Sequence, residues 1–329
     1  MNVLPSRRLL AATVCGLLAA CDPSSNSGFD AVDATESATA VMKAIQQSPA
    51  LHSLSVLGSN ITVSASAAGA RTAPLTLAPR ATAAPIFPAD LLGTTLTYNL
   101  SQRRYEVSSQ AGAPSTGVRF ILYAVDPVAH RVVEPLNAAG YLDLTDKSTP
   151  AAAILGVKIV IDNTTLLDYD ASASFTTGSI AFSANGLVSD GTTAVDFGLN
   201  QLVANGPTIS VDYLLAVPEN GVTLSLNAKT SAGGTDVGLT VEHNNNFTVV
   251  HAVGDDSAIT GTITYNGATV VNISGTPEHP VFTTPTGDRL PARQVETLTR
   301  LFDVADAVFD AFDDLLGPAH RLLGFPLTS

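Results

Sequence analysis

The sequence predicts a mainly β protein: one long antiparallel β-meander, with an amphipathic helix near each end of the chain. Two observations support this fold class. Apolar and polar residues alternate through one segment after another, the pattern of strands with one buried and one solvated face. Pairs of turn-forming residues separate these segments, as expected where hairpins join consecutive strands.

The meander is assigned to residues 93–276. Within it, apolar side chains occupy the odd positions from Ile209 to Val217 and the even positions from Val222 to Ala228. Because side chains alternate between the two faces of a strand, these positions share one interior face. The large apolar residues assigned to that interior are Phe175, Phe182, Phe197, Tyr213, Leu224, Leu239 and Ile263.

The turns between these segments combine Asn or Asp with Gly. Examples are Asp190-Gly191, Asn205-Gly206 and Asn266-Gly267. Both central residues of a two-residue hairpin turn need a positive φ, which Gly and Asn adopt at the lowest cost. The turns therefore favour a meander of hairpins over a sheet with long crossovers.

A C-terminal helical cover is assigned to residues 277–329, because the strand pattern stops after Pro277 and Pro280. From Pro291 the apolar residues recur every three or four positions, which predicts a helix to Leu316, ended by Gly317 and Pro318. The residues expected to dock this helix on the sheet are Val295, Leu298, Phe302, Phe309, Phe312 and Leu316. The carboxylates at 303, 306, 310, 313 and 314 share its other face. We interpret them as a solvated face, with weak cation binding as the alternative.

The width of the sheet predicts that it curls. About twelve strands would make an open sheet roughly 58 Å wide, whereas a helix is only about 10 Å across. We therefore expect a half-barrel or a closed barrel, with both helices packed on its concave apolar face. Closed barrels of about eleven strands are known to hold a central helix.

The region before the meander is divided into a helical segment and a linker. Residues 30–58 are expected to be helical, since Ala34, Ala38, Val41, Met42 and Ile45 follow helical spacing. Residues 59–92 are rich in Ala, Pro and Ser and are expected to form an extended linker.

The first 21 residues have the pattern of a targeting segment. Arg7 and Arg8 precede an apolar run too short to span a bilayer stably, and the run ends in Leu-Ala-Ala before Cys21. This ending resembles the lipobox of bacterial lipoproteins, in which the cysteine is lipidated and becomes the first residue. An ordinary secretory signal before a chance cysteine is the alternative.

The resemblance implies a location and an anchor. Residues 1–20 would be removed, Cys21 would carry the acyl chains and residues 21–29 would form a tether, so that the protein is lipid-anchored in the bacterial cell envelope. The outer membrane or the cell surface is slightly favoured. The inner membrane stays possible, because Asp22 resembles the inner-membrane retention signal of enteric bacteria.

Charge and motifs exclude several classes of function. Loss of Arg7 and Arg8 leaves 14 basic against 29 acidic residues, a formal net charge of −15, which disfavours nucleic acid and anionic headgroups as partners. The six histidines have no spacing typical of metal ligands, and no nucleophile elbow or phosphate-binding loop is present. We expect no catalysis, no metal and no cofactor.

Two functions remain in competition. The first is a structural or interaction lipoprotein whose sheet is filled by its own helices. The alternative is a carrier that binds a lipid or another hydrophobic molecule on the concave side, because small residues such as Ala171 and Ala184 among the large ones would leave a groove. That architecture resembles lipoprotein carriers and acceptors. A membrane-spanning barrel and an unrecognised enzyme are weaker interpretations.

Overall fold

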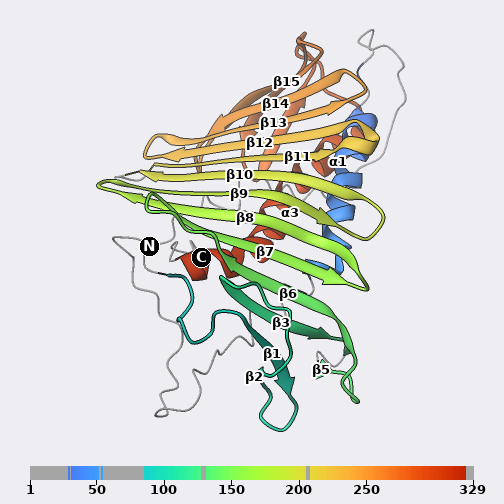
Figure 1. Ribbon diagram of the computed structural model, residues 1–329. Helices are drawn as coiled ribbons and strands as arrows, with labels where there is room; N and C mark the ends of the chain where they lie inside the picture. The colour runs from blue at the N-terminus through green and yellow to red at the C-terminus, as the bar shows by residue number, and fades with distance from the viewer. Residues whose placement is uncertain are drawn as a thin grey trace. The chain divides into compact units, whose positions relative to one another are not determined.

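The structure is a computed structural model that describes residue 29 and residues 31–51, 53–54, 85–126, 131–204 and 208–323 (Figure 1). The predicted signal peptide, Cys21, nearly all of the tether and the linker up to residue 84 lie outside these residues. The described chain divides into two compact units. One contains the described residues up to Ala44 together with Val195–Ala311, and the other contains Ile45–Ala194 and the chain from Phe312.

The mainly β prediction is confirmed in its coarse form. Among the described residues, fifteen strands belong to a large sheet, and β4 (Val125–Asp126) and β5 (Arg131–Val132) form a small separate one. The large sheet is antiparallel apart from one pair of strands. An α-helix precedes the strands and another follows them, as expected.

In the first unit each strand is antiparallel to the next one along the chain. The strands are β10 (Ala194–Ala204), β11 (Ile209–Val217), β12 (Val222–Ser231), β13 (Gly234–His243), β14 (Asn246–Gly254), β15 (Ile259–Tyr265), β16 (Ala268–Thr276) and β17 (His279–Thr283). A short 3-10 helix, η1 (Pro218–Asn220), joins β11 to β12. The Asn266-Gly267 turn has φ values of 49° and 83°, the positive pair that a two-residue hairpin needs.

Strand β17 corrects the predicted end of the meander. It contains Pro280, from which the sequence predicts no further strand, yet it pairs with β16 from Thr283 back to His279. Proline has no N–H to donate to a ladder, so it is tolerated where one side of the strand has no partner. β17 is such an edge strand within its unit.

In the second unit the strands are β1 (Thr94–Asn99), β2 (Arg104–Ser108), β3 (Gly117–Tyr123), β6 (Ala138–Asp146), β7 (Ala153–Ile161), β8 (Thr164–Thr176) and β9 (Ser179–Ser189). Their order is β9-β8-β7-β6-β3-β1-β2. The turn between β7 and β8 is made by Asp162 and Asn163, both with positive φ. It was not among the predicted turns, although its residues are of the expected types.

The strand order at β1 to β3 departs from a simple meander. β1 pairs with β2 in the antiparallel direction but with β3 in parallel, through Thr94–Leu96 and Val118–Phe120. β3 is almost continuously apolar and is largely buried, whereas β2 is half-exposed. Placing β3 between β1 and β6 buries it between two neighbours and leaves the more polar β2 at the edge.

The N-terminal helix α1 (Ala31–Gln46) occupies the first part of the helical segment predicted for residues 30–58, and residues 49–51 and 53–54 are also helical, whereas residues 55–58 lie outside the described residues. Ala34, Ala38, Val41, Met42 and Ile45 are all buried. In the first unit α1 and α3 (Ala292–Leu323) lie on the same face of the strands (Figure 1). The Thr35 hydroxyl donates to the carbonyl oxygens of Ala31, at 2.8 Å, and of Thr297 in α3, at 3.2 Å.

Helix α3 corrects the predicted stop at Gly317 and Pro318, because it continues to Leu323 with Pro318 inside it. An internal proline removes one helical hydrogen bond and crowds the carbonyl group four residues earlier. Continuation of the helix buries Ala319, His320 and Leu323. We attribute the tolerance of Pro318 to this burial.

The end of the predicted linker is also corrected. Ile86, Phe87 and Leu91 are buried, and the Ile86 amide donates to Asp146 Oδ2 at 2.8 Å. Large apolar side chains gain free energy when they leave water, so this apolar segment packs instead of staying extended in solvent.

Candidate functional site

The apolar face of the strands is the first candidate site, because the predicted interior residues lie there. Six of the seven are at most 8 % exposed, and Phe175 is half-buried. Phe197, Tyr213, Leu224, Leu239 and Ile263 belong to the first unit, and Phe175 and Phe182 to the second.

In the first unit α3 contacts this face. Leu298, Leu301, Ala305 and Val308 are at most 1 % exposed, and their alternating spacing of three and four residues makes a continuous helical stripe. The predicted docking residues Val295, Phe302 and Phe309 are half-buried beside that stripe. Two of them make ring contacts with the sheet: Phe309 with Tyr213 at 5.2 Å between ring centroids, and Phe302 with Phe282 at 5.9 Å.

In the second unit the last turns of α3 contact the same face. Phe312, Leu315 and Leu316 are at most 1 % exposed. The Tyr169 hydroxyl donates to the Leu315 carbonyl oxygen at 3.2 Å. This bond joins β8 to the last turns of α3.

Burial changes the titration of two side chains in this packed region. It raises the pKa of Tyr169 above its usual range and lowers the pKa of His320 to about 4. The His320 ring lies 4.1 Å from that of Phe182. Both residues are therefore neutral at physiological pH, and we treat them as core groups.

The positions expected to leave a groove lie under this packing. Ala171 and Ala184 face each other across β8 and β9 and are 0 % exposed. Small residues allow neighbouring elements to approach closely. Along these positions the strands present no open apolar surface in the described part of the chain.

A second candidate is a cluster of Ser, His and Asp between α1 and the β13–β14 turn. His243 Nδ1 lies 3.1 Å from Ser37 Oγ and 3.2 Å from Asp33 Oδ1, and its Nε2 lies 2.8 Å from the Asn244 amide nitrogen. Amide nitrogens donate, so Nε2 accepts and the proton is on Nδ1. With its proton on Nδ1, the ring donates towards Asp33 and Ser37.

This cluster does not have the geometry of a catalytic triad. In a triad the nucleophile and the carboxylate bind opposite ring nitrogens, so that the ring can take the hydroxyl proton. Here both oxygens meet the same protonated nitrogen, and Ser37 is 7 % exposed. The arrangement instead ties α1 to the end of β13.

The third candidate is a row of alternating charges on the other face of the second unit. Arg119, Asp143, Lys158 and Asp168 are direct neighbours across β3, β6, β7 and β8. Arg119 binds Asp143 through Nε and a terminal nitrogen, both at 2.7 Å, and lies 3.7 Å above the Tyr141 ring. Lys158 binds Asp168 at 2.9 Å. Hydrogen bonding to the carboxylates raises the pKa of Arg119 and of Lys158.

The positive and negative side chains of this row neutralise one another. Opposite charges placed directly across a sheet stabilise the pairing of the strands, and a shift of one residue would separate every pair. We therefore interpret it as fixing strand register. The row cannot be recognised in the sequence, because its charges are far apart in the chain and meet only through the strand register.

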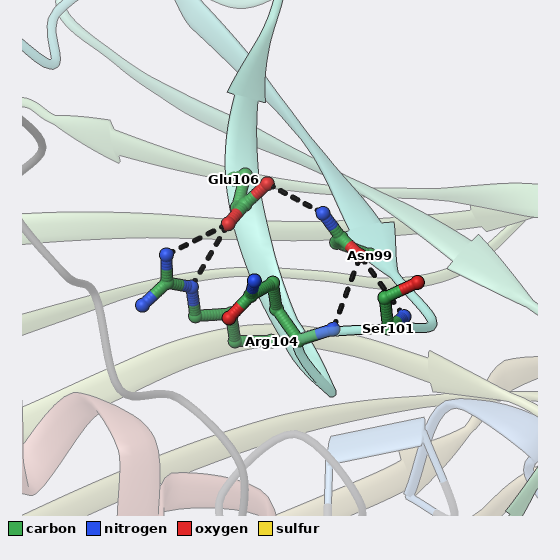
Figure 2. A network of polar contacts seen from close by, with 5 residues as sticks. Asn99, Ser101, Arg104 and Glu106 are labelled. Carbon is green, nitrogen blue, oxygen red and sulfur yellow. Dashed lines mark hydrogen bonds and ion pairs between the residues drawn. The ribbon is translucent and has the colours of Figure 1, made fainter.

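The β1–β2 hairpin carries a compact polar network (Figure 2). Asn99 Nδ2 donates to Glu106 at 2.7 Å, and Asn99 Oδ1 accepts from the amides of Ser101 and Gln102. Arg104 Nε donates to the second oxygen of Glu106 at 2.9 Å. Hydrogen bonds from Asn99 and Arg104 lower the pKa of Glu106. Since every member pairs within the hairpin, the network serves the turn itself.

The acidic face of α3 differs from the prediction at one residue. Asp303, Asp310, Asp313 and Asp314 are exposed as expected, but Asp306 is half-buried. Burial, with the charges of Asp303 and Asp310, raises its pKa to about 6. The described residues contain no group of three or more His, Cys, Asp or Glu side chains able to hold a metal ion.

The histidines fall into three environments. His320 is buried and His243 half-buried, while His251 and His279 are exposed. His52 and His130 lie outside the described residues. No helix in the described ranges is both long and apolar enough to cross a membrane.

The chain matches no known family model, and neither the curated proteins nor the solved structures contain a match.

Proposed function

We propose that the chain is a lipid-anchored lipoprotein of the bacterial cell envelope with a structural or interaction role and no catalysis. The lipobox-like ending at Cys21 supports the anchor, since acyl chains on one cysteine suffice for stable attachment. In this proposal the sheet curls into a half-barrel or barrel around α1 and α3.

The burial of side chains on the apolar face, together with the contacts that α3 makes with this face, supports this role over that of a carrier. Ligand pockets are usually concave, largely apolar and preformed. At Ala171, Ala184 and Leu224, where a groove would need accessible surface, the side chains are 0 % exposed. A sheet filled in this way offers partners its polar face.

One feature still favours the carrier as a second candidate. Leu96, Tyr98, Tyr105 and Val107 share the apolar face of β1 and β2 by their register. Tyr98 and Tyr105 are half-buried and Val107 is 48 % exposed. At this edge an acyl chain could contact apolar side chains.

Metabolic labelling tests the anchor. Palmitate should enter the wild-type protein but not the Cys21→Ala variant, and the wild type should remain in the membrane fraction. Equal labelling of the two would show that Cys21 is not the lipidated residue.

Titration with a fluorescent fatty acid separates the two roles. The scaffold proposal expects no saturable binding at up to millimolar fatty acid. Saturable binding that Val107→Asp abolishes would favour the carrier, whereas binding unchanged by Val107→Asp would place the ligand elsewhere.

A further inference from the structure

The first described residues of the chain lie at one end of the strands of the first unit. The Phe29 ring packs against the ring of Tyr265, the last residue of β15, with 5.6 Å between the ring centroids. Asp33 and Ser37, in the first two turns of α1, contact His243, the last residue of β13. Independent contacts therefore fix where the chain enters this unit.

Three turns of the sheet lie at the same end as these contacts. They are residues 218–221 between β11 and β12, residues 244–245 between β13 and β14, and residues 266–267 between β15 and β16. The pairing of Val222 with His243 and of Thr248 with Tyr265 aligns them. We call these three turns, together with Phe247, the entry end of the first unit.

Phe247 is an exposed aromatic side chain at the entry end. It is 41 % exposed, although its backbone is held in place: its amide donates to Asn266 Oδ1 at 2.9 Å, and Asn266 Nδ2 donates to Asn246 Oδ1 at 3.1 Å. The ring thus stays partly in solvent on a well-fixed turn. Phenylalanine is one of the side chains with which proteins enter the boundary between water and lipid.

The turns of the entry end carry little charge. They contain four asparagines and a single ionisable residue, Glu219. At the other end of the same strands the turn between β12 and β13 is uncharged, but the β14–β15 turn contains Asp255 and Asp256 and the β16–β17 turn contains Glu278. Amides cost less free energy than carboxylates when water is displaced from them. The turns of the entry end are therefore the better suited to a lipid surface.

The position of Cys21 favours the same end. Seven residues separate Cys21 from Phe29, so even a fully extended chain spans at most about 29 Å between the two. Strand β13 has 10 residues and is therefore about 33 Å long. A lipid on Cys21 keeps the entry end near the bilayer, whereas the opposite end could rest on the bilayer only if this stretch were drawn out completely.

We infer that the entry end of the first unit faces the membrane and that Phe247 contacts the headgroup region of the bilayer in which Cys21 is anchored. The inference rests on the proposed lipidation of Cys21 and deepens it, because it names the surface of the protein that meets the lipid. The turns at the opposite end then point away from the membrane, where partners can reach them.

Tryptophan fluorescence tests this contact, since the natural chain contains no tryptophan. Phe247→Trp and the matched control Val253→Trp each place one reporter on the same face of β14, at positions that are 41 % and 42 % exposed. Six residues put the two reporters about 20 Å apart along the strand. Each mature, lipidated variant is reconstituted into phosphatidylcholine vesicles that contain lipids with a nitroxide quencher on the headgroup.

We expect the quencher lipid to remove at least twice as large a fraction of the emission from residue 247 as from residue 253, after each is normalised to its quenching by acrylamide in detergent. A protein lying with its outer sheet face on the bilayer would show equal quenching at both positions. Equal quenching, or stronger quenching at residue 253, in protein that floats with the vesicles would overturn the inference and leave the anchor in place. Protein that carries no palmitate and does not float would show that the anchor fails, and the inference with it.

Discussion

Replacing Asp306 with asparagine should stabilise the protein at neutral pH. Asp306 is half-buried on α3, and its pKa is raised from 3.8 to about 6, first by burial and then by the charges of Asp303 and Asp310. A carboxyl group that binds its proton more tightly in the folded state reduces stability once it is ionised. Asparagine has a similar shape and no charge, so it removes that cost.

The magnitude follows from the two pKa values. The difference between them corresponds to a loss of at most about 3 kcal/mol in the free energy of unfolding, since each unit of pKa difference is worth about 1.4 kcal/mol. Asp306 keeps some contact with water, which screens the charge, so we expect a gain of roughly 1–2 kcal/mol above pH 7. The gain should shrink as the pH falls from about 6 to 4, where the wild-type carboxyl group becomes protonated in both states.

Urea unfolding of both proteins at several pH values measures this difference. His320 acts in the opposite direction: its pKa, lowered to about 4 by burial, causes stability to fall as the pH falls from 6.5 to 4. That effect is common to both proteins and cancels in the comparison. Asp314→Asn, at an exposed position, is the control and should change stability by less than about 0.5 kcal/mol. A gain that is absent at pH 7, or equal at pH 4 and pH 7, would refute the reasoning.

Three further predictions concern packing and ion pairs, each measured as a free energy of unfolding. Phe312→Ala should cost about 3–5 kcal/mol, since this ring is 1 % exposed, whereas Phe302→Ala at the half-buried flank should cost clearly less; equal costs would contradict the packing described for α3. Tyr169→Phe should cost about 1–3 kcal/mol because the Leu315 carbonyl loses a buried partner, and no change would show that this bond does not help to hold α3 on the strands. Arg119→Ala should cost about 2 kcal/mol, since Asp143 is only 14 % exposed; the exposed pair of Arg300 and Glu296 is the control, where Arg300→Ala should cost less than about 0.5 kcal/mol.

Local patterns allowed much of the fold to be predicted. Alternation located most strands, because burial of one face imposes a period of two whichever strands become neighbours. Helical spacing located α1 and the start of α3 in the same way. The parallel pairing of β1 with β3 could not be predicted, since it depends on which strand gains most from a central position. The local preferences of Pro280 and Pro318 predict ends of elements that the structure does not have, because tertiary context outweighed these preferences: Pro280 lies in an edge strand and Pro318 in a buried helix end.

Prediction of the candidate sites would have required the strand register even more than prediction of the fold did. Phe247 is recognisable in the sequence as an apolar residue beside a turn, but its place at the entry end follows only from the pairing of β14 with β15. The charged side chains from Arg119 to Asp168 are likewise aligned only by the pairing of their strands. The burial of Asp306 could not be predicted from a helix face that otherwise reads as solvated. Lipidation of Cys21 rests on sequence alone and stays a prediction.

Hydrogen exchange along α3 tests the central claim most directly, namely that the chain's own helices fill the apolar face of the sheet. Amides within a packed helix exchange only through rare opening, whereas a loosely held helix exchanges quickly. We predict that the amides from Leu298 to Ala319 exchange as slowly as those of the central strands β8 and β12. Rapid exchange along α3, with the strands still protected, would show that the helix does not fill the sheet and would contradict the account.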